Sequence, residues 1–158
     1  MRCTIHPATA QDIANVVLGH DNASTAGDGG VRLDALLEAC AISRQVWTAA
    51  NADGDPLAFI GAAPWAEDAD RGRLWFVVLA AYDGNEVDLK SVMRLTVAEM
   101  LRVFGQLENN VGADKTWALA LMRDAGFTVE APQLTADGER RHRVWIDADA
   151  IGGAAPTA

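Results

Sequence analysis

The sequence predicts an α/β fold, in which helices cover both faces of a central mixed sheet. Three observations predict it. Segments with helical spacing of apolar residues alternate with short strand-like segments along the chain. Residues 73–81, "RLWFVVLAA", form an almost continuous apolar run, which is typical of a strand in the centre of a sheet. Asp-Gly pairs at 53–54 and 137–138 separate strand-like segments, and such pairs favour hairpin turns.

The first half of the chain places two helices before the first hairpin. The predicted elements are a strand at 2–8, helices at 8–20 and 31–43, and strands at 44–50 and 56–64. Thr9 and Asp12 have the spacing of a capping box, which favours a helix start at this point. A glycine-rich loop joins the two helices.

The second half begins with the central strand. Its predicted elements are strand 73–81, helix 88–104, strand 105–112, helix 115–125 and a final hairpin of strands 127–135 and 141–147. Asp88 and Asp114 are the predicted caps of the two helices. Gly126 should end the second of them, because glycine takes the left-handed conformation without a steric clash. We expect a single domain over residues 1–150 and a disordered tail over 151–158.

Composition and charge disfavour several classes of partner. The chain has 158 residues, of which 50% are apolar and 22% charged, as in globular domains. Its formal net charge of -9 disfavours nucleic acids and anionic membrane surfaces, since both bind basic faces. No apolar run approaches the roughly 20 residues of a membrane span. The first residues lack the apolar core of a secretory signal.

Metal and redox chemistry have no support in the sequence. Cys3 and Cys40 match no metal or redox spacing, and we expect both thiols to be reduced. His6, His20 and His142 are scattered along the chain, so no metal site is predicted.

Residues 115–127, "KTWALALMRDAGF", contain a more specific pattern. Together with the order of elements, this stretch resembles the GNAT fold of the acetyl-CoA-dependent N-acetyltransferases. The last helix of that family often reads Asn, two spacers, Ala, two spacers, Leu-Tyr, three spacers, Gly-Phe. Ala118, Leu121, Gly126 and Phe127 fall on this pattern. The resemblance implies a single GNAT-like domain.

A narrower similarity extends over roughly residues 4–132. The segments "SRQVWTAANADGDPLAFIGAAP" (43–64) and "NNVGADKTWALALMRDAGF" (109–127) are similar to a GNAT-like family of tailed podophages. Some members of that family are linked to internal virion proteins. The resemblance implies a phage protein in the host cytoplasm, either free there or incorporated in the virion, with a phage or host protein as its partner.

The cofactor loop that the resemblance implies is altered. A GNAT enzyme binds the CoA pyrophosphate with a loop of the type Gln/Arg-x-x-Gly-x-Gly/Ala, using backbone N–H groups and a helix N-terminus. Residues 81–90, "AYDGNEVDLK", have one glycine, Gly84, and no second one two residues later. The carboxylates of Asp83, Glu86 and Asp88 would compete with an anion for the same donors.

Little else in this region favours a bound CoA. Lys90 is the only cation near the loop. The backbone of Val78, Leu79 and Ala80 offers donors for the pantetheine arm, as strand edges do for extended ligands. We therefore expect acetyl-CoA to bind weakly or not at all, and to be the cofactor only if the protein is an active enzyme.

The family's usual proton donor is also missing. The tyrosine that commonly protonates the leaving thiolate corresponds to Met122, which has no proton to give. The asparagine that begins the family pattern is Lys115. Trp117 and Met122 are predicted to lie in the core, because an aromatic residue and a methionine at helical spacing usually face inward.

Two functions remain open. If the chain is catalytic, Glu108 is the candidate base for the amine and Tyr82 the candidate acid; the alternative is a solvated edge carboxylate and a loop aromatic. One function is that of a non-catalytic phage protein that acts in virion assembly, in the internal head or on a host factor. The other is that of a working N-acyltransferase with an unusual cofactor loop. The loop and position 122 favour the first.

Overall fold

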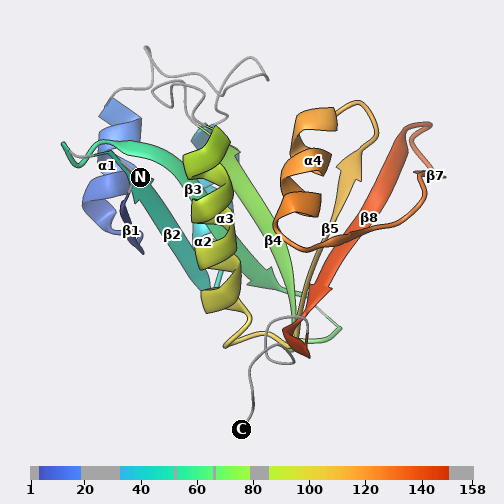
Figure 1. Cartoon of the computed structure of the whole chain (residues 1–158). Helices are drawn as coiled ribbons and strands as arrows, with labels where there is room; N and C mark the ends of the chain where they lie inside the picture. Colours follow the sequence, from blue (N-terminus) through green and yellow to red (C-terminus); the bar gives the residue numbers. More distant parts are fainter. Residues whose placement is uncertain (1–3, 19–32, 52, 66, 79–85, 150–158) are drawn as a thin grey trace, which may run out of the picture. The chain divides into compact units, whose positions relative to one another are not determined.

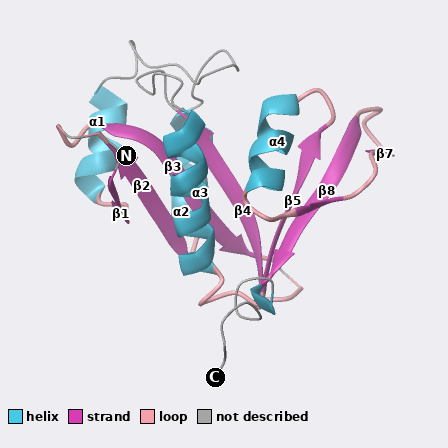
Figure 2. Cartoon of the chain, viewed as in Figure 1, coloured by secondary structure: helices cyan, strands magenta, loops and turns pink. Residues whose placement is uncertain are grey.

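The computed structural model describes residues 4–18, 33–51, 53–65, 67–78 and 86–149 (Figures 1 and 2). Its helices are α1 (Ala10–Leu18), α2 (Leu33–Ile42), α3 (Glu86–Met100) and α4 (Thr116–Asp124). Its strands are β1 (Thr4–Pro7), β2 (Gln45–Ala50), β3 (Pro56–Pro64), β4 (Arg71–Val78), β5 (Gln106–Gly112), β6 (Thr128–Val129), β7 (Gln133–Leu134) and β8 (Arg140–Asp147). The strand order is β1-β2-β3-β4-β5-β8-β6, and β7 also pairs with β8. Because β4 and β5 are parallel while β5 and β8 are antiparallel, the predicted mixed α/β sheet is confirmed.

The chain forms two compact units, and both β4 and α3 contribute to each of them. The first unit consists of Met1–Ala63 and Trp75–Val92, and the second of Pro64–Leu74 and Met93–Ala158. Residues 79–85 and 150–158, which include most of the expected cofactor loop and the expected tail, lie outside the described residues.

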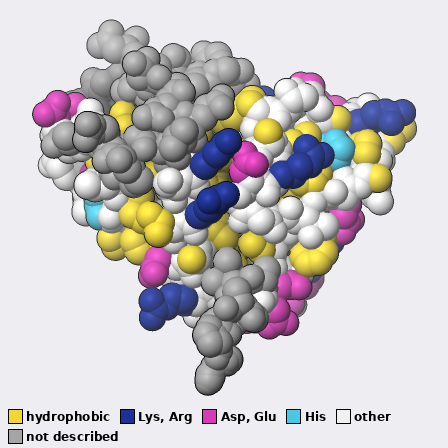
Figure 3. Space-filling view, in the orientation of Figure 1, with side chains coloured by type: hydrophobic (Ala, Val, Ile, Leu, Met, Phe, Trp, Pro, Cys, Tyr) yellow, Lys and Arg dark blue, Asp and Glu magenta, His cyan; other side chains and the backbone are white. Residues whose placement is uncertain are grey.

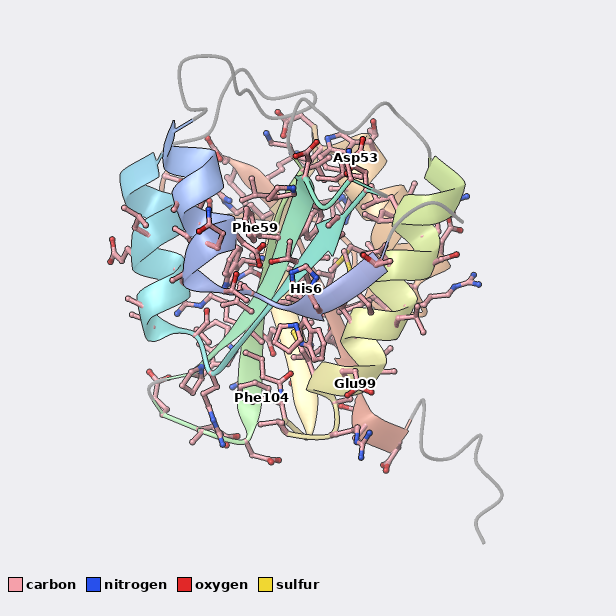
Figure 4. The ribbon with its side chains drawn as sticks, turned by 90° about the vertical axis from the view of Figure 1, so that its left-hand side faces the viewer. His6, Asp53, Phe59, Glu99 and Phe104 are labelled. Atoms are coloured by element: carbon pink, nitrogen blue, oxygen red, sulfur yellow. The ribbon has the colours of Figure 1, made fainter. Side chains whose placement is uncertain are left out.

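In the first unit, α1 and α2 pack on the face of the sheet that Phe59 of β3 occupies (Figure 4). Phe59 and Leu36 of α2 are buried together, and Ile13 of α1 and Trp75 of β4 pack against them. Aromatic and branched side chains on alternate strand positions meet the apolar stripes of the two helices, so the helices bury one face of this part of the sheet.

Two local predictions in the first unit are confirmed. The Asp12 backbone N–H donates to Thr9 Oγ1 and the Thr9 N–H donates to Asp12 Oδ2, at 3.1 and 2.9 Å, which is the reciprocal pattern of a capping box. In the hairpin between β2 and β3, Gly54 has a φ of +86°. Asn51 Oδ1 accepts hydrogen bonds from the N–H groups of Asp53 and Asp55, and these bonds close the turn.

In the second unit, β4 and β5 lie side by side. Residues Arg71–Arg73 pair in parallel with Gln106–Glu108, and the Asn109 side-chain amide donates to the Leu74 carbonyl at 2.6 Å. β5 then pairs along its whole length with β8. The apolar side chains on one face of these strands, among them Leu107 and Ile146, are buried.

The segment that carries the family pattern ends α4 with a Schellman motif. The Phe127 N–H donates to the Met122 carbonyl and the Gly126 N–H to the Arg123 carbonyl, both at 3.0 Å. Gly126 has a φ of +100°, so glycine ends this helix as predicted. The motif directs Phe127 into the core, where it is buried.

Several boundary and burial predictions were wrong. Lys115, and not Asp114, is the N-cap residue of α4, and it makes no side-chain capping bond. α3 begins at Glu86, so Asp88 lies inside its first turn, and it ends at Met100. Trp117 is 42% exposed, because it lies on the outer side of α4 while Met122 faces inward.

Replacing Phe127 by Ala should lower the free energy of unfolding by about 3–5 kcal/mol, the usual cost of removing a buried aromatic side chain. Denaturant titration measures the change. Leu134→Ala is the control, since Leu134 is 70% exposed and should contribute almost nothing. A loss below about 1 kcal/mol for the Phe127 variant would mean that the Gly-Phe pair does not anchor α4.

Candidate functional site

The residues predicted to hold acetyl-CoA are described only in part. Leu79, Ala80 and Tyr82 lie outside the described residues. Val78 is the last residue of β4 and is buried, and Lys90 is a half-buried residue of α3. Their roles as cofactor ligands, and that of Tyr82 as an acid, stay predictions.

Glu108 lies on β5 and is only 5% exposed, so it is not the solvated edge carboxylate of the alternative interpretation. Strand register explains its burial. Arg71 of β4 is opposite Gln106, and Arg143 of β8 is opposite Asn110, so each arginine lies diagonally across from Glu108 on the same face of the sheet. Long side chains reach across such diagonals.

Both arginines bind the Glu108 carboxylate. The Arg71 Nη2 atom lies 2.5 Å from Oε1 of Glu108. Arg143 makes a bidentate contact, with Nη2 at 3.0 Å from Oε1 and Nε at 3.1 Å from Oε2. Arg143 Nη1 and Trp145 Nε1 also donate to Oε2 of Glu130, at 2.7 and 2.8 Å. We call these five residues the Glu108 cluster.

The cluster holds Glu108 in its charged form. Burial by itself raises the pKa of the carboxyl, but the hydrogen bonds from Arg143 and Arg71 outweigh burial, and the pKa lies below its ordinary value. The hydrogen bond to Glu108 likewise raises the pKa of Arg143. A carboxylate with a lowered pKa and two guanidinium partners is a weak base toward an amine, because those donors must be lost before it can accept a proton.

Position 122, where the family's usual acid stands, holds a residue that cannot act as an acid. Met122 is buried in α4, and its thioether cannot donate a proton. The prediction that Met122 belongs to the core is confirmed.

A second buried carboxylate lies in the first unit. Oδ2 of Asp12 accepts hydrogen bonds from Thr48 Oγ1 at 2.9 Å and contacts His6 Nε2 at 3.0 Å, in addition to its bond from the Thr9 N–H. Burial raises the pKa of Asp12, but these hydrogen bonds outweigh it and lower the pKa. Thr48 donates to Asp12, so the hydroxyl is not aimed at His6 as the nucleophile of a triad would be.

Two of the three arginines in the basic segment 139–143, "ERRHR", make ion pairs. Arg141 contacts Glu139 at 2.7 Å and Asp137 at 3.6 Å, and Arg143 belongs to the Glu108 cluster. On the face of the molecule that Figure 3 shows, Lys and Arg side chains are interspersed with hydrophobic, acidic and uncharged ones. Among the described residues, no group of His, Cys, Asp and Glu side chains could hold a metal ion.

Sequence patterns identified Glu108 but not its partners. Alternation along β4 and β8 could have placed Arg71 and Arg143 on one face of each strand. The diagonal contacts required the register between strands, which the sequence does not contain.

No helix in the described part of the chain is long and apolar enough to cross a membrane.

Solved structures with the same arrangement of elements identify the fold. The phosphinothricin acetyltransferase of Sinorhizobium meliloti, a GNAT superfamily protein in complex with AcCoA, superposes with a TM-score of 0.71 and 14% identity over 93% of this chain and 89% of its own. The chain therefore has the GNAT fold. The GNAT domain of S. lividans PAT gives a TM-score of 0.66 at 16% identity, over 92% of this chain and 90% of that domain.

A further match is a structure with two bound ligands. AAC(6')-Ib in complex with paromomycin and acetyl-CoA has a TM-score of 0.69 and 16% identity, with both chains covered completely. No protein-family model and no curated protein sequence matches the chain. At these identities, the matches establish the GNAT fold alone.

Replacing Glu108 by Gln should destabilise the protein by about 2 kcal/mol near neutral pH, because two guanidinium groups lose a charged acceptor. We expect less than for a fully buried pair, since Arg71 and Arg143 remain 33% and 36% exposed. The pKa of Glu108 is lower in the folded than in the unfolded state. The wild-type carboxylate therefore adds stability above the unfolded pKa of about 4.3, and this stability is lost as pH falls through the folded pKa.

Denaturant titrations at a series of pH values between about 7 and 3 measure this difference. Glu99→Gln is the matched control, since Glu99 is 43% exposed and contacts Arg102 at 3.5 Å on the surface of α3. A gap between wild type and Glu108→Gln that stays constant over the whole pH range would contradict the ion-pair assignment.

Proposed function

We propose that this chain is a tailed-phage protein built on the GNAT fold, with a degenerate acyl-CoA site. It acts through contacts with a phage or host protein, in virion assembly, in the internal head or on a host factor, and not by acyl transfer. It works in the host cytoplasm or as part of the virion.

The state of Glu108 is the observation that carries the non-catalytic part of this proposal. Its carboxylate is buried and bound by Arg71 and Arg143, so it serves to join strands rather than to take up a proton. Met122 occupies the position of the usual acid and is buried. The loop sequence 81–90 adds three carboxylates and lacks the glycine pair that approaches a pyrophosphate.

The phage assignment rests on sequence similarity. Segments 43–64 and 109–127 carry the resemblance to the podophage family. The first segment includes β2, the Asp53-Gly54 turn and β3, and the second includes most of β5 and all of α4. Mass spectrometry of purified virions tests this part, since detection of the chain supports a place in the particle and its absence favours a host factor as the partner.

An acetyl-CoA-dependent N-acyltransferase is the second candidate. Two of the proteins with the same fold were solved with acetyl-CoA bound, which favours this candidate as far as the fold is concerned. In that case the backbone at Val78–Ala80 would bind the pantetheine arm, and Glu108 would have to leave its arginine partners to act as base.

Isothermal titration with acetyl-CoA separates the two candidates. We expect weak or undetectable binding, since each carboxylate near the pyrophosphate adds an unfavourable term of about 1 kcal/mol at 4 Å in water. Free CoA is the control, because it carries the same pyrophosphate without the acetyl group. A low-micromolar dissociation constant would overturn the non-catalytic proposal. Turnover by the Glu108→Gln variant would then test the base, and a large loss would assign that role to Glu108.

A further inference from the structure

A tryptophan at the start of the second unit carries two arginines on its ring. Trp65 follows β3, and its backbone N–H donates to the Arg71 carbonyl at 3.0 Å. The backbone N–H of Arg71 donates to the Asp68 carbonyl at 3.1 Å. These bonds close the loop and bring the indole beside the first residues of β4. The guanidinium of Arg71 lies 5.1 Å from the ring centroid and that of Arg73 lies 4.6 Å from it. We call Trp65, Arg71 and Arg73 the Trp65 corner.

Arg73 differs from the other arginines on this face of the sheet. Arg71, Arg141 and Arg143 each contact at least one carboxylate. Arg73 is exposed. Within the described part of the chain it stacks on Trp65 and forms no ion pair with a carboxylate. Stacking holds the guanidinium in one plane and leaves its edge N–H groups for a ligand, so less conformational entropy is lost when an acceptor binds.

Two further donors at the corner have no acceptor. Trp65 Nε1 and Arg71 Nε are buried and make no hydrogen bond within the described part of the chain. They are shielded from direct contact with a ligand, but unsatisfied N–H dipoles add positive potential around them. This potential and the unpaired guanidinium of Arg73 both favour an anion at the corner.

We propose that the Trp65 corner binds a carboxylate in an acidic segment of a protein partner. Arg73 supplies the charged, bidentate contact, and Trp65 fixes its orientation. This inference rests on the proposed function, because it gives the chemistry of the partner that a non-catalytic protein needs. Nucleic acid fits less well, since a phosphate backbone requires several unpaired cations along a face.

Two carboxylates of the neighbouring acidic loop, Asp68 and Asp70, have partners other than Arg73. Asp68 Oδ1 accepts from the Asp70 N–H at 3.0 Å, and Asp70 Oδ1 accepts from the Gly105 N–H at 3.3 Å, so both carboxylates bind the local backbone. The net charge of -9 opposes general association with acidic chains. Binding therefore depends on the contact at Arg73, because long-range repulsion is screened beyond about 8 Å at physiological salt.

Fluorescence anisotropy with a labelled peptide of alternating Glu and Asp, at physiological salt, tests the proposal. The counterpart peptide of Gln and Asn has the same shape without the charge. We expect the wild-type protein to prefer the acidic peptide and Arg73→Gln to weaken that binding by about tenfold, the effect of one charge-assisted contact. Trp65→Phe should weaken it less, since a smaller ring still supports the guanidinium.

Arg102→Gln is the matched control, because it removes the same charge from a side chain that is 76% exposed and lies on the surface after α3. It should leave binding unchanged. The proposal is overturned if the wild-type protein fails to prefer the acidic peptide, or if Arg73→Gln binds as well as Arg102→Gln. Thermal melts of each variant show that it is folded. Tight acetyl-CoA binding would overturn the non-catalytic function and leave this peptide result standing, so the two failures are distinguishable.

Discussion

Burial of the Glu108 carboxylate is the constraint on which the second unit depends. A charge at 5% exposure is tolerated only when it is paired and hydrogen-bonded. Arg71 from β4 and Arg143 from β8 meet that need, and Glu130 balances the second positive charge. The cluster thus ties together three neighbouring strands and the residue that follows β6. A register slip of one residue would turn Glu108 toward the apolar face and leave both guanidinium groups without their acceptor.

The same alternation gives the sheet of the second unit two different faces. Leu107, Val144 and Ile146 are buried on one of them, and Ile146 lies close to the helix end at Gly126. The other face carries the Glu108 cluster and the Trp65 corner. On that face, ion pairs and stacked arginines stabilise the sheet in place of apolar packing. They also determine which of these arginines has no carboxylate partner among the described residues. Of the arginines in the Glu108 cluster and the Trp65 corner, Arg71 and Arg143 contact carboxylates, and Arg73 is the one that we propose a partner uses.

These features support the proposal that this GNAT fold serves a function other than acyl transfer. The fold supplies strands and helices, but the chemistry depends on a base that can accept a proton, an acid that can donate one, and a loop that holds a pyrophosphate. Here the base candidate is a structural carboxylate, the acid position is a buried methionine, and the loop sequence is acidic. The proposed phage role rests on the sequence resemblance, and the proposed partner chemistry rests on Arg73 and Trp65.

The sequence by itself determined the order of elements, the capping box at Thr9, the Asp53-Gly54 turn and the glycine end of α4, because short-range hydrogen bonds and backbone conformation dictate them. It also placed Met122 in the core. Only the tertiary structure decided the environment of Glu108 and the exposure of Trp117. Burial of a strand carboxylate depends on which residues lie diagonally across from it, and periodicity places a helical side chain on a face without saying whether that face is covered.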